Sequence, residues 1–119
     1  MTTVEIANRL VELCRGGKWE QAQKELFAED AVSIEPYSTP AFEKETKGLT
    51  AIIEKGQKFE AMAQKLHKVE VSEPIVAGNA IAFKLIMDVT MKERSRETWE
   101  ELCVYVVKEG KIISEQFFL

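Results

Sequence analysis

Glu35 ends a short apolar segment and stands directly before Pro36. Residues 30–35 predict a strand that Pro36 ends, because proline has no backbone N–H to donate to a sheet. If the Glu35 carboxyl faces an apolar cavity, lost hydration raises its pKa and suits it to accept a proton near neutral pH. If it faces solvent, it is an ordinary residue at a strand end. The position of this one side chain therefore decides whether the segment supports proton chemistry.

Two more glutamates lie among apolar residues near the C-terminal end of the sequence. Glu101 shares a predicted strand face with Trp99 and Cys103. Glu115 shares one with Phe117. Carboxyls that meet in one cavity raise each other's pKa, so at least one holds a proton at neutral pH and can donate it while another accepts. A register shift of one residue would instead place both glutamates on the rim of the cavity or at a subunit contact.

Apolar and aromatic residues are available to form the wall of such a cavity. Tyr37 and Phe42 lie in the loop of residues 36–47, which has the length of a lid or a binding loop. Phe42 either contacts a ligand or plugs the cavity, and Tyr37 or Tyr105 can supply a hydroxyl group. The candidate substrate-binding residues are Tyr37, Phe42, Phe59, Phe83, Leu85, Met87, Trp99, Cys103 and Phe117.

The composition is that of one small globular domain covering residues 1–119, with a net charge of −4. This charge gives no reason to expect nucleic acid or a membrane as a partner. A single histidine and the lack of a Cys-x-x-Cys pair predict no metal site, and the lack of a glycine-rich phosphate loop predicts no nucleotide cofactor. Two cysteines and an N-terminus without a leader pattern predict a protein of the reducing cytoplasm.

Apolar periodicity divides the sequence into helices followed by strands. Spacings of three and four predict a first helix that ends at Gly16, with an apolar stripe that includes Val4. A shorter second helix follows, and a third runs over residues 48–66. Helices followed by an antiparallel meander predict an α+β fold with the helices on one face of the sheet. From residue 67 the period changes to two, which predicts strands over 67–75, 80–92, 97–108 and 111–119.

The predicted strand of residues 97–108 is apolar on both faces. Leu102, Val104 and Val106 alternate with the residues of the face that carries Glu101. A strand that is apolar on both faces needs a cover on its outer side. We therefore expect a homodimer through the outer face of the sheet.

Several stretches of the sequence resemble the nuclear transport factor 2-like superfamily, which includes the SnoaL-like proteins. Residues 16–19 and 26–32 resemble the turn between the family's first two helices and the run into its first strand. Residues 46–52 resemble the start of the third helix, and residues 109–118 the closing hairpin and last strand. The resemblance implies a cone-shaped α+β barrel, in which three N-terminal helices pack on a curved, mainly antiparallel sheet. It also implies a deep apolar pocket and, commonly, a dimer through the sheet.

Within this superfamily, residues 27–36 resemble the ketosteroid isomerase segment in which the catalytic aspartate directly precedes a proline. Glu35 holds that place here. The isomerase also has two hydrogen-bond donors to the developing oxyanion, a tyrosine on the first helix and a protonated aspartate on a meander strand. Leu10 stands at the place of the tyrosine, and the place of the aspartate falls near Cys103. Neither donor is retained.

These observations support two functions. The first is a cofactor-independent isomerase, cyclase or hydrolase in which Glu35 removes a proton next to a carbonyl of a small apolar substrate. Glu101 or Glu115 would return the proton or polarise the oxygen. The second is a non-catalytic ligand-binding or dimerisation module, in which Phe83 and Phe117 bind a small apolar molecule by contact alone.

Overall fold

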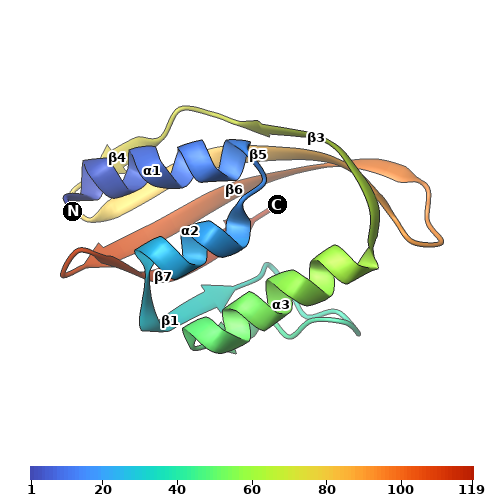
Figure 1. Ribbon diagram of the computed structural model, residues 1–119, viewed down its shortest axis with the longest axis horizontal. Helices are drawn as coiled ribbons and strands as arrows, with labels where there is room; N and C mark the ends of the chain where they lie inside the picture. Colours follow the sequence, from blue (N-terminus) through green and yellow to red (C-terminus); the bar gives the residue numbers. More distant parts are fainter.

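Three helices cover one face of a single curved, open sheet in the computed structural model, which describes residues 1–119 (Figure 1). This arrangement confirms the predicted α+β class. No helix has the length and the apolar character needed to cross a bilayer. The helices are α1 (Thr3–Arg15), α2 (Trp19–Leu26) and α3 (Leu49–Met62).

Local sequence accounts for both ends of α1. The Thr2 side chain accepts a hydrogen bond from the backbone N–H of Glu5, and the Glu5 side chain accepts one from the backbone N–H of Thr2, which forms a capping box. Gly17 follows the helix with a φ of 70°, a conformation that glycine adopts without strain. Val4 is exposed, so it does not belong to the buried stripe that the spacing predicted. The buried residues of α1 are Ile6, Ala7, Leu10, Val11, Leu13 and Cys14.

The sheet has seven strands in the order β2-β1-β7-β6-β5-β3, with β4 paired to β5. β1 and β7 run parallel, and all other pairs are antiparallel. Figure 1 shows the hairpin between β5 and β6 projecting beyond the helices. The strands are β1 (Phe27–Ile34), β2 (Glu45–Lys47), β3 (Ala63–Val71), β4 (Ile75–Ala77), β5 (Ala80–Met91), β6 (Arg96–Lys108) and β7 (Lys111–Phe118).

Several element boundaries differ from the sequence prediction. β1 begins at Phe27 because α2 ends one residue earlier, and it stops one residue before Glu35. α3 ends at Met62 rather than at residue 66, because Ala63 and the residues after it pair with β5 instead of continuing the helix. The short strands β2 and β4 were not predicted. β2 pairs with β1, and the backbone N–H of Glu35 extends this contact by donating to the Lys44 carbonyl at 2.7 Å.

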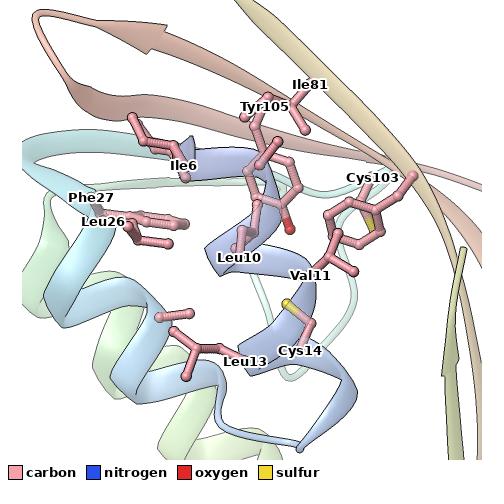
Figure 2. Packing of buried hydrophobic residues seen from close by; sticks show 14 of the residues in the cluster. Ile6, Leu10, Val11, Leu13, Cys14, Leu26, Phe27, Ile81, Cys103 and Tyr105 are labelled. Carbon is pink, nitrogen blue, oxygen red and sulfur yellow. The ribbon is translucent and has the colours of Figure 1, made fainter. Parts of the chain in front are cut away.

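The core lies between the helices and the inner face of the sheet. Figure 2 shows residues of α1 and α2 packed against Phe27, Ile81, Cys103 and Tyr105, which come from three strands. On β6 the alternation follows the prediction, because residues from Cys103 to Val107 are buried at every second position. The outer face of β6 is different, since Leu102 keeps 45% of its surface exposed.

Candidate functional site

A cavity of about 780 Å³ lies between the helices, the loop that follows β1 and the inner face of the sheet. Hydrophobic residues make up 19 of the 32 that line it. Both the volume and the apolar lining suit a small organic molecule. A second hollow of about 440 Å³ near β2 has one hydrophobic residue among the five that line it, so it lacks the walls to enclose such a molecule.

The structure brings all but one of the candidate residues to the wall of this cavity. The exception is Cys103, whose side chain is enclosed in the core and does not belong to the wall. The candidate residues on the wall are Glu35, Tyr37, Phe42, Phe59, Phe83, Leu85, Met87, Trp99, Glu101, Glu115 and Phe117.

Phe42 contributes to the wall without filling the cavity, since the volume of about 780 Å³ exists with its ring in place. A short turn positions it, in which the backbone N–H of Phe42 donates to the Thr39 hydroxyl at 3.0 Å. The Lys58 ammonium of α3 lies 5.0 Å from the centre of the Phe42 ring, within the range of a cation–π contact. The loop is therefore attached to α3 and closes one side of the cavity.

Lys55 is the wall cation that contacts Glu35. It lies three residues after Ile52, a fully buried residue of α3, so both side chains emerge on the same side of the helix. The Lys55 ammonium donates to the Ser33 hydroxyl at 2.6 Å and to a Glu35 carboxylate oxygen at 3.0 Å. It also lies 5.9 Å from the centre of the Phe117 ring. Glu35 thus faces the cavity as one half of an ion pair.

Strand register aligns three inward-facing residues of neighbouring strands. Ser33 of β1 is the partner of Glu115 in β7, and Glu115 is the partner of Tyr105 in β6. Directly paired residues have Cβ atoms about 4.5–5.5 Å apart. Ser33 accepts a hydrogen bond from Lys55, so its own hydroxyl proton is free to be donated to Glu115. Ser33, Glu115 and Tyr105 thus form a row across three strands. Through Ser33, this row connects the Lys55 ammonium to Glu115, which is only 5% exposed.

Burial raises the pKa of Glu115 to about 7, although a hydrogen bond from Ser33 and the charge of Lys55 act in the opposite direction. Burial also raises the pKa of Glu101 to about 7, and repulsion from Glu35 and Glu115 adds to this effect. These groups interact, so their protons are shared by the cluster as a whole. Near neutral pH the cavity therefore contains carboxyls in both protonation states, which is the requirement for donating one proton and accepting another.

The two cysteines do not take part in this chemistry. Burial raises the pKa of the Cys14 thiol to about 12, and it raises that of Cys103 still further. Both side chains remain neutral thiols at neutral pH, and a thiol is a poor nucleophile until it loses its proton. Cys103 lies 4.0 Å from a Glu101 carboxylate oxygen, so it packs behind the wall carboxyl instead of contacting a ligand.

The sequence analysis missed Lys55 and Ser33. One signal for Lys55 was available, because the position falls between Ile52 and Phe59 at helical spacing and interrupts the apolar face of α3 with a charge. A charge at such a position needs a partner. No comparable signal marks Ser33, since a small hydroxyl residue within a strand is common on either face.

Comparisons with known proteins agree with this fold. The family model described as the SnoaL-like domain matches residues 1–119. A candidate SnoaL-like polyketide cyclase from Mesorhizobium loti is similar over 100% of both chains, with 32% identity and a TM-score of 0.93. No curated protein matches the chain.

More distant solved structures share the fold alone. A candidate SnoaL-like polyketide cyclase from a Jannaschia species has 16% identity and a TM-score of 0.78, over 98% of this chain and 83% of that one. A protein of ketosteroid isomerase-like fold from Catenulispora acidiphila, in complex with trimethylamine, has 18% identity and a TM-score of 0.75, over 99% and 87%. The match of the family model to every residue, together with the similarity to the Mesorhizobium loti protein, shows that the chain belongs to the SnoaL-like family.

Proposed function

We propose that the chain binds a small, largely apolar carbonyl compound and catalyses proton transfer on it, as an isomerase or cyclase without a cofactor. The observation that carries this proposal is the meeting of Glu35, Glu101 and Glu115 on the wall of one apolar cavity, with Lys55 as the cation among them. The similarity to a candidate polyketide cyclase supports the same class of reaction. The two free cysteines support a reducing location such as the cytoplasm.

The wall carboxyls have different roles in this proposal. Glu35, whose side chain pairs with Lys55 at 3.0 Å, removes a proton from the carbon next to the substrate carbonyl. Glu101, whose pKa is about 7, returns a proton to a second carbon or to oxygen. The Lys55 charge lowers the energy of the negative charge that develops on the substrate between these two steps. Glu115 is the most enclosed of the three, and it connects to Lys55 through Ser33.

The wild-type protein should catalyse the exchange of the α-hydrogens of 2-tetralone for deuterium in heavy water, measured by proton NMR. After subtraction of the buffer rate, the exchange rate should fall as pH rises through about 7, because Glu101 must hold a proton in order to donate it. The concentration of protein-bound 2-tetralone, followed by line broadening in the same samples, serves as the control for occupancy. Binding without any protein-dependent exchange would refute the catalytic proposal.

That outcome would favour the alternative, a non-catalytic module that binds apolar molecules. The observation in its favour is the predominance of hydrophobic residues in the lining, 19 of 32. Phe83 and Phe117 would then bind the ligand through contact alone, and the carboxyls would serve only to order the wall.

We further propose that the chain forms a homodimer through the outer face of the sheet. Leu102 and Phe118 are register partners on this face and keep 45% and 46% of their surfaces exposed. Val104 and Val106 continue the apolar stripe along β6 and are only half-buried. An exposed apolar surface on a sheet is best covered by the same surface of a second copy, because a two-fold axis makes it self-complementary.

Replacing Val104 with glutamate should convert the dimer to a monomer, because two like charges would be buried opposite each other in the interface. Sedimentation velocity measures the change. Gln64→Glu on β3 is the matched control, since Gln64 is exposed and lies away from this stripe, and it should leave the dimer intact. A wild-type protein that sediments as a monomer at all concentrations would contradict the proposal.

A further inference from the structure

Tyr105 is held rigidly at the inner end of the cavity. It is only 4% exposed. Its ring stacks on Phe83 with a centroid distance of 5.4 Å and an interplanar angle of 23°, and it meets Phe27 edge-on at 6.4 Å and 72°. Two aromatic contacts from different strands fix both the position and the tilt of the ring. The direction of its hydroxyl group is therefore determined by the fold.

This hydroxyl has no hydrogen-bond partner in the protein, although Tyr105 is buried. No polar side-chain atom that is fully enclosed lacks a partner in the structure. The Tyr105 oxygen must therefore be accessible from the cavity, whose wall includes Tyr105. Figure 2 shows the ring pointing from β6 toward α1, with the hydroxyl oxygen (red) projecting toward Leu10.

Apolar side chains surround the ring, and the nearest ionisable groups, which include Glu115 and Glu101, make no hydrogen bond with the hydroxyl. Leu10, Phe27 and Phe83 lie on the wall around the same inner end of the cavity. A fixed donor that faces the cavity without a partner in the protein is satisfied by a ligand that brings its own acceptor.

We infer that the Tyr105 hydroxyl donates a hydrogen bond to a carbonyl oxygen of the ligand, so that the ligand enters the cavity with its oxygen-bearing end first. The inference deepens the proposed function, because it names the protein group that contacts the reacting carbonyl. The hydroxyl acts as a donor at any working pH, since burial raises the pKa of Tyr105 well above its ordinary value.

This hydrogen bond places the carbonyl beside the wall carboxyls, because Tyr105 is the register partner of Glu115. When a carboxylate removes the α-proton, the electron pair of the C–H bond forms a C=C bond and the carbonyl π pair moves onto oxygen. The Tyr105 donor stabilises that oxyanion. If the substrate carries a C=C bond next to this α-carbon, the proton returns to the far carbon of that bond, the double bond shifts and the electron pair on oxygen restores the carbonyl, so that no atom is gained or lost. Tyr105 thus supplies, from β6, a donor that Leu10 on α1 cannot provide.

The test compares two probes that differ in one oxygen, 2-acetylnaphthalene and 2-ethylnaphthalene. Tyr105→Phe should weaken the binding of the ketone about 3–10-fold, the value of one hydrogen bond, and leave the binding of the hydrocarbon unchanged. In the infrared spectrum, the carbonyl band of the ketone bound to the wild type should lie below its position in hexane. In Tyr105→Phe the band should move back toward the hexane value.

Tyr37→Phe tests the competing donor, because Tyr37 is the only other tyrosine and also belongs to the wall, although it lies exposed in the loop after β1. This variant should keep the shifted band, and loss of the shift in Tyr37→Phe would overturn the inference. Equal loss of affinity for both probes in Tyr105→Phe would also overturn it, because the ring would then act by packing alone. A carbonyl band of the wild-type complex at the hexane position would also overturn the inference. The same holds if the wild type shows no saturable binding of the ketone.

The infrared measurement separates this inference from the proposed function. It reports on the bound ketone whether or not turnover occurs, and an unshifted wild-type band refutes the inference even if Tyr105→Phe does not fold. A shifted band without deuterium exchange refutes only the catalytic proposal. Deuterium exchange with an unshifted band refutes only the role of Tyr105.

Discussion

Glu35→Gln should lower the protein-catalysed rate of deuterium exchange into 2-tetralone by about 10²–10⁴-fold, the usual contribution of a general base. Glutamine keeps the shape of the side chain and a hydrogen-bond acceptor for the Lys55 ammonium, which now lies 3.0 Å from the carboxylate. It cannot accept the proton. The affinity for 2-tetralone should therefore change little, and the whole effect should appear in the exchange rate.

The control for this experiment is Glu70→Gln. Glu70 is exposed on β3 and pairs only with Lys68, at 2.6 Å, so the variant removes a glutamate without touching the cavity. Its exchange rate should equal that of the wild type. If Glu35→Gln kept the wild-type rate, Glu35 would not be the base, and the role would pass to Glu101 or Glu115.

Glu115→Gln should stabilise the protein at pH 8 and flatten the dependence of its stability on pH. The folded-state pKa of Glu115 is about 7, whereas a glutamate in an unfolded chain has a pKa of about 4.3. Between these two values the folded state binds more protons than the unfolded state. The free energy of unfolding of the wild type therefore falls as pH rises through this window. The loss from Glu115 is on the order of 3 kcal/mol, and glutamine, which stays neutral, avoids it.

Urea unfolding between pH 5 and pH 8, followed by tryptophan fluorescence at a fixed protein concentration, measures this difference. At pH 5 the stabilities of the variant and the wild type should lie much closer together, since both side chains are then neutral in the folded state. The free energy of unfolding of the variant should still fall with rising pH, but less steeply than that of the wild type, because Glu101 has a raised pKa as well. A variant that is less stable than the wild type at pH 8 would show that Lys55 and Ser33 compensate fully for the buried charge.

The inward face of the long strands could be predicted because their residues alternate. A period of two over β6 leaves one choice of face for Glu101 once the buried positions are recognised. On β7, Glu115 shares its face with Phe117, but a register shift interrupts the alternation before them, and Ile112, three residues before Glu115, is buried as well. The place of Glu35 came instead from a resemblance, because the residue lies just beyond β1, where no alternation applies. The wall residues were thus predictable from strand patterns and from a known family, with Cys103 as the exception that packs behind the wall.

The features that the sequence did not predict depend on contacts between segments that lie far apart in the chain. Lys55 interrupts the apolar face of α3 in the sequence, but only the approach of β1 to α3 shows that Ser33 and Glu35 are the partners of its ammonium. The strands β2 and β4 have three residues each, too few to show any periodicity. The end of α3 was predicted too late because pairing of residues 63–71 with β5 outweighs the helical pattern that continues past Met62.

The parallel pairing of β1 with β7 determines when the candidate site can assemble. β7 comes after every other strand of the chain, yet it occupies an interior position in the sheet, between β1 and β6. The row from Ser33 to Tyr105 therefore joins residues of high sequence separation, and closing such a loop costs entropy before any contact forms. During synthesis on the ribosome, the helices can associate early, whereas the carboxyl cluster must wait until the last strand has emerged.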